Sequence, residues 1–232
     1  MKVCVINFSG NVGKTTVAAH LIAPRLGAPI FSVESLNSDA SADGVELEQM
    51  KGKQYADLQA EMLMRDSSVV DVGASNVEIF LKLMGDFAGS HEDYDLFVVP
   101  VVKDKKQLTD SVNTLHTLRH MGVPAAKLRV VFNMVEPDDD LQSDFAALLA
   151  TTEDLAMTTR RAVVHKNEVF ERLKGTGRSL ASVIADRTDY RAQLRLTSDE
   201  DEKHALVNRI AEQRLAVACS RNLDSAFAAI MA

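Results

Sequence analysis

The residues with the clearest capacity for chemistry form a glycine-containing loop near the start of the chain. The loop reads Asn7-Phe8-Ser9-Gly10-Asn11-Val12-Gly13-Lys14-Thr15-Thr16. The apolar run before it, Val3–Ile6, predicts a short buried strand, and the pattern after it, from Val17 to Leu26, predicts a helix. A strand, a loop ending in Gly-Lys-Thr and a helix form the context of a phosphate-binding loop. Main-chain N–H groups of such a loop bind phosphate oxygens at the positive end of the helix dipole.

We therefore predict that this loop binds the phosphates of a nucleotide. Lys14 is expected to lie beside the β- and γ-phosphates and to take part in catalysis, and the Thr15 hydroxyl is expected to bind Mg²⁺. The usual pattern has glycine where this chain has Phe8. Asn11 stands where a further glycine is common, and asparagine tolerates a positive φ better than other non-glycine residues. A helix start without a ligand is the alternative. The predicted nucleotide-binding residues of the loop are Gly10, Asn11, Val12, Gly13, Lys14, Thr15 and Thr16.

The loop resembles the deviant Walker A loop of the MinD/ParA group of P-loop ATPases. The whole opening, through His20-Leu21-Ile22-Ala23-Pro24-Arg25, is similar to the StbB plasmid stability branch of that group, which is found on conjugative plasmids. MinD and ParA carry a second lysine early in the loop that reaches the nucleotide of a dimer partner, and this chain has Ser9 at that position. The resemblance implies ATP and Mg²⁺ as cofactors, an ATP-dependent homodimer, and a role in plasmid stability, partition and conjugative transfer.

The end of the second predicted strand carries a polar segment. The resemblance implies that this segment is switch I, which positions Mg²⁺ and the attacking water. Glu34 matches the first acid of the family pattern, but Leu36 occupies the place of the second. Asp39, or else Asn37, is therefore expected to orient the water, and Asp39 is our candidate catalytic residue. The alternative is a polar loop that caps the next helix.

The third predicted strand, Ser67–Gly73, ends in an acid followed two residues later by glycine. This pattern resembles the second carboxylate motif of the family. The resemblance implies that Asp71 holds Mg²⁺ through water and acts in catalysis, and that the Gly73 N–H faces the γ-phosphate. Asp71 also falls at the carboxyl end of a strand, where α/β proteins bind ligands. The alternative is that Asp71 caps the helix that begins near Asn76.

Another predicted strand, Leu128–Asn133, ends in asparagine. In the family an asparagine at this place reads the adenine edge, and an amide suits that edge because it donates and accepts at once. Asn133 is therefore a candidate adenine contact. A turn residue before Glu136 is the alternative.

Composition limits the classes of protein to which the chain belongs. With 232 residues, 46% of them hydrophobic, it is expected to form one α/β domain over 1–232. No apolar run approaches ~18 residues, and Met1-Lys2 leads directly into a strand, so neither a membrane span nor a signal peptide is expected. Cys4 and Cys219 indicate buried thiols in a reducing cytoplasm. The net charge of −7 argues against a uniformly basic nucleic-acid surface.

Strands alternate with helices along most of the chain. This alternation predicts a doubly wound, mainly parallel sheet of the P-loop NTPase class, with a helical C-terminal extension at about 190–232. Within this fold, a helical region is expected over Val45–Arg65, and Pro100 is expected to end or bend strand pairing. Leu206, Ile210 and Val217 are expected along one side of the last helix.

These residues predict a weak ATPase that converts ATP to ADP and phosphate, because the usual second lysine and second switch I acid are absent. The expected partners are ATP and ADP, and an adaptor or DNA-binding protein encoded nearby. Direct DNA contact stays open, and the net charge gives it no support. The alternative is a nucleotide-gated interaction protein without meaningful hydrolysis. A small-molecule kinase is a third reading, but no acceptor pocket or base stands out in the sequence.

Overall fold

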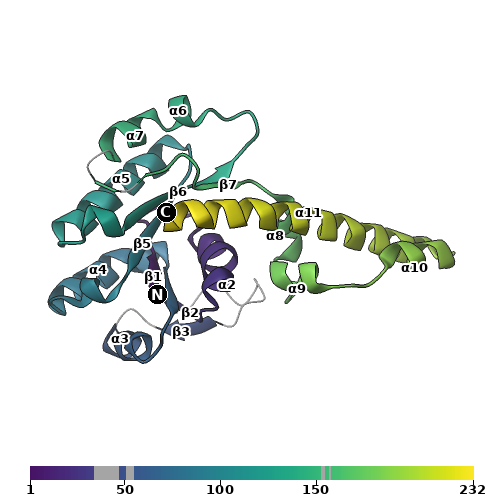
Figure 1. Ribbon diagram of the computed structural model, residues 1–232, viewed down its shortest axis with the longest axis horizontal. Helices are drawn as coiled ribbons and strands as arrows, with labels where there is room; N and C mark the ends of the chain where they lie inside the picture. The colour runs from purple at the N-terminus through teal and green to yellow at the C-terminus, as the bar shows by residue number, and fades with distance from the viewer. Residues whose placement is uncertain (34–46, 51–54, 153–154, 157) are drawn as a thin grey trace.

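A computed structural model describes residues 1–33, 47–50, 55–152, 155–156 and 158–232. Its centre is a seven-stranded sheet in the order β3-β2-β4-β1-β5-β6-β7, and every neighbouring pair in it is parallel (Figure 1). This is the doubly wound α/β architecture that the sequence predicts. The strands are β1 (Lys2–Val5), β2 (Ile30–Val33), β3 (Leu47–Met50), β4 (Ser68–Val72), β5 (Leu96–Val101), β6 (Leu128–Val135) and β7 (Val163–His165).

Helices cover both faces of the sheet. The first face carries α3 (Tyr55–Leu63), α4 (Val77–Asp86), α5 (Lys105–His120) and α7 (Ala146–Thr152), with α6 (Leu141–Asp144) beside them. The second face carries the helix after β1, α8 (Glu168–Leu173), α9 (Leu180–Ala185) and part of α11 (Glu200–Met231). Among the described residues, short 3₁₀ turns complete the chain at Ala74–Asn76, Ser90–Asp93 and Ala125–Lys127.

The strands bury apolar residues on both sides. In β1, Val3 and Val5 belong to the core on the second face, whereas Cys4 and Ile6 belong to the core on the first. Side chains alternate between the faces of a strand, so a continuous apolar run suits a strand that is covered twice. This explains why the strands read as unbroken hydrophobic stretches in the sequence.

The helix after the loop is continuous from Lys14 to Leu26 and contains a π-helical stretch. It comprises α1 (Lys14–Thr16), the π-helical η1 (Val17–Ile22) and α2 (Ala23–Leu26). Pro24 has no N–H to donate to the His20 C=O, and Arg25 Nη1 donates to that oxygen instead at 2.8 Å. The helix ends at Gly27, whose φ of 59° is the left-handed conformation common after a last turn.

The end of the chain forms a projecting arm. We define the arm as α10 (Tyr190–Leu196) together with the first half of α11, which extends away from the sheet (Figure 1). The second half of α11 packs on the sheet and the helix after β1. None of the helices in the described ranges combines the length and apolarity needed to cross a bilayer. The residues of α11 that pack on the second face are Ala216, Cys219, Leu223, Ala226 and Ile230.

Three local predictions need correction. The region Val45–Arg65 is not helical throughout, because Leu47–Met50 forms β3 and pairs with β2, where backbone pairing overrides helical propensity. Pro100 does not end strand pairing: it lies opposite Val131 within the β5–β6 ladder. Val217 is 41% exposed and does not share the buried side of α11.

Candidate functional site

The loop after β1 lies at the centre of the sheet. Strand β1 stands between β4 and β5, and these neighbours continue to opposite edges. The crevice at the carboxyl ends of the strands at such a reversal is where open α/β sheets bind ligands. The topology therefore places the loop at the ligand-binding edge.

Asn7 fixes the start of the loop. Its side chain is fully buried, and Nδ2 donates to Pro100 O at 2.9 Å and to Ser111 Oγ at 2.7 Å. Its Oδ1 accepts from the Ser9 N–H at 2.8 Å. In a parallel sheet the N–H and the C=O of one residue point toward the same neighbouring strand. The Pro100 C=O points toward the end of β1, so the N–H that proline lacks would not have bonded to β6. These contacts bind the loop to β5 and α5.

Backbone conformation then shapes the middle of the loop. Asn11 has a φ of 57°, which agrees with its prediction as a substitute for glycine, and Gly13 has a φ of 79°. A Cβ on Gly13 would lie 2.2 Å from Asn133 Nδ2, so only glycine fits there. Asn133 Nδ2 donates to Val12 O at 2.8 Å. The loop therefore packs directly against β6.

Asn133 lies inside β6 rather than in the turn after it. Its side chain is buried, at 3% exposure, and one amide donor holds the phosphate loop in place. This contact is a positioning role that the sequence did not indicate. The side-chain nitrogen of Asn133 already donates to the Val12 C=O. Contact of the same side chain with adenine stays a prediction.

Lys14 is the buried cation of the loop. It is 7% exposed, and its Nζ donates to Ser9 O at 2.7 Å. The side chain therefore folds back over the loop, so that its charge lies among main-chain groups. A lysine so held places a positive charge beside any anion that the loop amides bind.

The side chain of Thr15, at the start of the helix after β1, meets that of Asp71 in β4. Thr15 Oγ1 donates to Asp71 Oδ2 at 2.7 Å, and Asp71 is 1% exposed near the end of β4. The capping alternative for Asp71 is wrong, because α4 begins after Asn76 without a side-chain cap. A hydroxyl and a carboxylate are hard oxygen donors, which suit Mg²⁺ together with phosphate oxygens and water. The described residues contain no cluster of three acidic, histidine or cysteine ligands.

Electrostatics beside this pair keep a neighbouring thiol neutral. Burial raises the pKa of Cys4 well above its usual value, and the negative charge of Asp71 raises it further. Cys4 lies close to Asp71 in the sheet, because β1 pairs with β4. The thiol therefore stays protonated and adds no second negative charge to the site.

Gly73 is engaged with the sheet. Its N–H donates to Val33 O at 3.0 Å, so contact with a γ-phosphate would require this bond to break. Its role in nucleotide binding stays a prediction. The candidate water-orienting residues Asp39 and Asn37, and the acid Glu34, lie outside the described residues.

Several supporting residues were missed by the sequence reasoning. Gln107 Nε2 donates to Gly10 O at 3.0 Å, and Thr114 Oγ1 accepts from the Phe8 N–H at 3.0 Å. Both lie on α5, far from the loop in sequence, and nothing in their local pattern indicates the contact. Met134 has a φ of 56°, and its Cε would lie 3.3 Å from a Cβ on Gly13. A non-glycine residue in this conformation is strained, and such strain gathers at functional sites.

Comparison with solved structures identifies the fold. MinD, the cell division ATPase of Pyrococcus furiosus, aligns with a TM-score of 0.55 at 12% identity, over 92% of this chain and 98% of that one. A putative plasmid partition protein of Borrelia burgdorferi bound to AMPPNP aligns at 0.51 and 12%, over 91% and 97%. A variant of McdA from Cyanothece in complex with ATP aligns at 0.50 and 12%, over 90% and 96%.

Sequence comparison adds no closer relative. No family model matches this chain, and no curated protein does. At this level of identity the structural likeness speaks for the arrangement of helices and strands alone. The chain has the fold of the MinD and ParA type of P-loop ATPases.

Proposed function

We propose that this protein is a ParA/MinD-like switch that binds ATP with Mg²⁺ at the loop after β1 and hydrolyses it slowly. The switch acts in plasmid stability, partition and conjugative transfer, with ATP promoting a homodimer. An adaptor or DNA-binding protein encoded nearby stimulates turnover. The plasmid role is supported by the similarity of the opening segment to the StbB branch, and by the partition role in the name of the Borrelia structural neighbour.

The observation that carries this proposal is the contact of Thr15 with Asp71 beside the Gly13-Lys14 turn. Thr15 Oγ1 and Asp71 Oδ2 lie 2.7 Å apart, and Lys14 is buried in the same loop. A hydroxyl, a carboxylate and an ammonium group thus gather at a helix N-terminus at the ligand edge of the sheet. Two of the solved structures with this fold are complexes with ATP or AMPPNP.

The chain's own residues support phosphoryl transfer by charge and position. Loop amides and Lys14 neutralise phosphate oxygens, and Lys14 exchanges its bond to Ser9 O for one to a phosphate. Thr15 and Asp71 would hold Mg²⁺, which would supply positive charge to offset the negative charge of the phosphates. Asn7 and Asn133 hold the loop rigid from two sides, so little reorganisation is needed on binding.

The alternative function is a nucleotide-gated interaction protein without meaningful hydrolysis. Ser9 favours it, because this chain lacks the lysine with which the family reaches across a dimer. Substitution of Leu36 by aspartate separates the two functions. If the wild-type protein turns over ATP measurably and Leu36→Asp raises that rate, slow hydrolysis is the natural activity. A variant that binds ATP with turnover still at zero would favour the gate.

Isothermal titration with ATP and ADP, with and without Mg²⁺, tests the binding site directly. We expect Lys14→Ala to abolish measurable binding, because the loop then lacks its cation. Lys82→Ala is the matched control, since Lys82 is an exposed lysine on α4. Equal ATP affinity in the Lys14→Ala variant and the wild-type protein would remove the basis of the proposal.

The metal role of Asp71 has its own test. We expect Asp71→Asn to bind nucleotide but to lose the gain in ATP affinity that Mg²⁺ brings, since the amide lacks the negative charge. Asp86→Asn, an exposed carboxylate at the end of α4, is the control. An Mg²⁺ response equal to that of the wild-type protein would exclude Asp71 from the metal site.

A further inference from the structure

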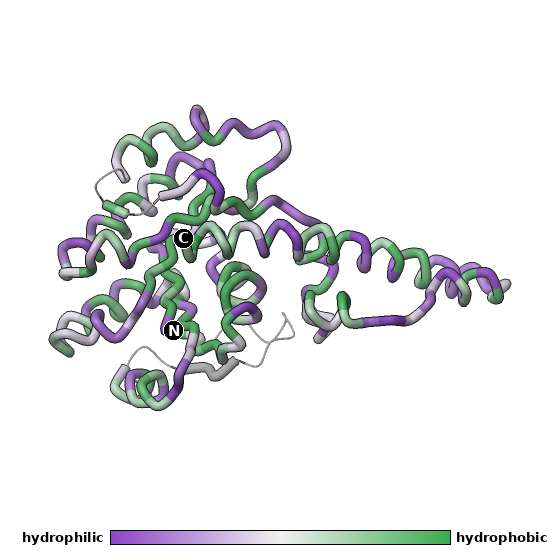
Figure 2. Tube along the Cα trace, in the orientation of Figure 1, coloured by the Kyte–Doolittle hydropathy of each residue, from purple (hydrophilic) through white to green (hydrophobic). Residues whose placement is uncertain are grey.

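Helix α11 carries a line of apolar and charged residues that the described chain leaves wholly or partly exposed. Along α11 the residues Glu200, Lys203, Val207, Ile210, Arg214, Val217 and Arg221 follow one another at alternating spacings of three and four. This is the spacing of a coiled-coil seam. Val207 is 49% exposed and Val217 is 41% exposed. Figure 2 shows apolar and polar stretches alternating along α11 out to its far end.

This seam is distinct from the one by which α11 packs on the sheet. The buried residues of α11 beyond Ala216 recur on a different side of the helix, at Cys219, Leu223, Ala226 and Ile230. One seam of α11 is therefore satisfied within the chain and the other faces solvent. Large exposed apolar residues that line up on one helix face mark an interaction surface.

A groove runs beside the exposed seam. It has a volume of about 500 Å³ and lies between the start of α10 and the middle of α11. Ile210 and Val217 lie in its wall, and Arg191, Arg214 and Arg221 line it as well. Among the described residues, none of these three arginines takes part in an ion pair. Asp189 is the one acid of the lining, so the groove combines apolar side chains with an excess of positive charge in a protein whose net charge is −7.

The chemistry that fits this groove occurs at the tip of the same arm. Glu200 and Asp201 are exposed in the first turn of α11, next to Asp199, which caps the helix, and Glu202. Leu196, at the end of α10, is 86% exposed. Glu200 forms an exposed ion pair with Lys203 at 2.6 Å, and the four acids leave the tip with an excess of negative charge. The acidic tip and the basic groove are therefore complementary in charge, and both carry apolar side chains. They cannot meet within one chain, because both lie along one straight helix.

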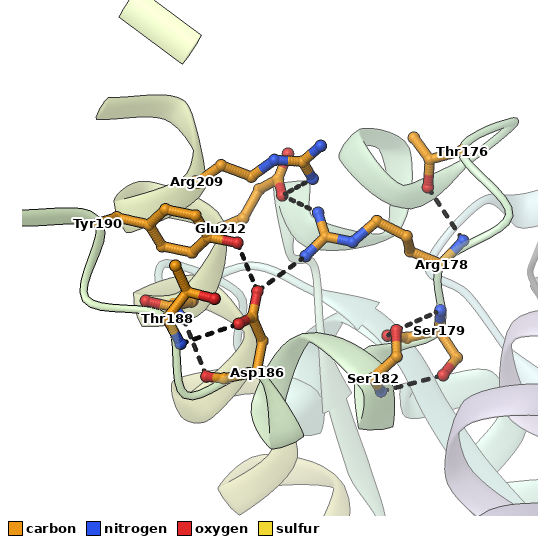
Figure 3. Close-up of polar contacts among 10 residues, drawn as sticks. Thr176, Arg178, Ser179, Ser182, Asp186, Thr188, Tyr190, Arg209 and Glu212 are labelled. Carbon is orange, nitrogen blue, oxygen red and sulfur yellow. Dashed lines mark hydrogen bonds and ion pairs between the residues drawn. The ribbon is translucent and has the colours of Figure 1, made fainter. Parts of the chain in front are cut away.

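A polar network at the base of the arm keeps the groove in shape. Figure 3 shows Asp186 at its centre, where Oδ2 accepts from Tyr190 Oη at 2.5 Å and lies 3.9 Å from Arg178 Nη2. Arg178 Nη1 and Arg209 Nη1 both donate to Glu212 Oε2, at 2.6 and 3.2 Å. These bonds join the start of α10 to α11, so the two walls of the groove keep a defined spacing.

We propose that the arms of two copies pair antiparallel, so that the acidic tip of each lies in the basic groove of the other. Glu200 and Arg221 lie about 15 Å on either side of Ile210 along the helix, so a two-fold axis near Ile210 brings each to the other. A parallel pair would place Glu200 beside Glu200 and Arg214 beside Arg214, which repel. This association needs no nucleotide and is independent of the function proposed above.

Sedimentation velocity of the full chain in EDTA, without nucleotide and over a range of protein concentrations, tests the pairing. We expect a concentration-dependent dimer. A groove variant, R214E/R221E, and a tip variant, E200R/D201R, should each weaken the dimer roughly tenfold or more, because each places like charges together. Far-UV circular dichroism confirms that each variant keeps its helix.

Mixing the two variants gives the decisive result. In a mixed dimer the acidic groove of one variant meets the basic tip of the other, and the basic groove meets the acidic tip. We therefore expect an equimolar mixture to dimerise like the wild-type protein. Failure of the mixture to dimerise, or a wild-type chain that stays monomeric at all concentrations, would overturn the proposal. So would a monomeric chain whose Arg214 and Arg221 bind an acidic peptide or duplex DNA instead.

The nucleotide-dependent dimer is distinguished by Lys14→Ala. This variant should still form the arm dimer, since Lys14 begins the helix after β1, which packs on the second half of α11 rather than on the arm. Loss of the dimer in Lys14→Ala alone would assign the association to the loop rather than the arm.

Discussion

The loop after β1 and the arm are built in opposite ways. In the loop Asn7, Ser9 and Lys14 are buried, and Asn7 donates to Pro100 and Ser111 of other elements. In the arm the polar side chains are exposed, and the network of Figure 3 links α10 to the body of α11. The conformation of the loop is thus set by contacts with neighbouring elements, whereas most of the surface of the arm stays exposed.

The difference has a physical cause. A buried polar group left without a partner costs about 1–3 kcal/mol, so a buried loop is held to one conformation. Exposed ion pairs are worth only about 0–1 kcal/mol each, so an arm built from them gains most of its remaining stability from apolar contact. Val207 and Val217 are apolar side chains of α11 that stay partly exposed.

One side chain joins the helix after β1 to α11. Arg25, at the end of the helix that the loop begins, donates to the His20 and Leu21 carbonyls and to Asp224 of α11 at 2.7 Å. It also donates to Ser220 O at 3.2 Å. The helix that the loop begins is thus tied to the second half of α11, whose first half belongs to the arm.

The largest expected effect lies in the loop. Gly13→Ala forces an L side chain into φ 79° and against Asn133, so we expect a loss of about 2–4 kcal/mol in the free energy of unfolding. Gly85→Ala is the matched control, because Gly85 lies in α4 with open space around it, and it should gain about 0.5–1 kcal/mol. Urea denaturation measures both. Equal stability of the two variants would show that the approach of β6 to the loop is not tight.

A smaller effect on stability is expected at Arg25, where the helix after β1 meets α11. Arg25→Ala loses the bonds to two helix carbonyls as well as the ion pair, so we expect it to cost about 1–2 kcal/mol. Asp224→Ala loses only an ion pair whose acid is 64% exposed, and about 0–1 kcal/mol is expected. Denaturation of both single variants and the double variant yields the coupling energy. If Asp224→Ala lowers the free energy of unfolding as much as Arg25→Ala does, the ion pair and not the carbonyl contacts provides the stability.

The smallest effect is expected at the base of the arm, under acid. Hydrogen bonds from Tyr190 and Thr188, with the charge of Arg178, lower the pKa of Asp186 to about 2. A lowered folded-state pKa contributes stability that is present above the unfolded value, about 3.9, and is lost as the pH falls through about 2.

Comparison of Asp186→Asn with the wild-type protein tests this prediction. The wild-type advantage in unfolding free energy should be constant near neutral pH and should shrink between about pH 4 and pH 2. Thermal unfolding followed by circular dichroism measures it. If the difference in unfolding free energy does not change over this range, the negative charge of Asp186 does not contribute to stability.

The sequence by itself determined the strands other than β3, the loop and most of the helices. Unbroken apolar runs such as Val3–Ile6 predict doubly covered strands, because both faces of the sheet must be dry. Gly13, Lys14, Thr15 and Asp71 were all predicted as site residues, since their types and places at strand ends follow local rules. The helical C-terminal extension at about 190–232 was also predicted, and α10 and α11 lie in it.

Only the tertiary structure decided which distant residues support these groups. Leu47–Met50 is a strand because β2 offers it a backbone partner, and Pro100 is tolerated inside β5 because its carbonyl faces Asn7. Val217 is exposed because the sheet covers a different side of α11. Such outcomes depend on what the rest of the chain brings alongside each residue, and a local pattern carries no information about residues far away along the chain.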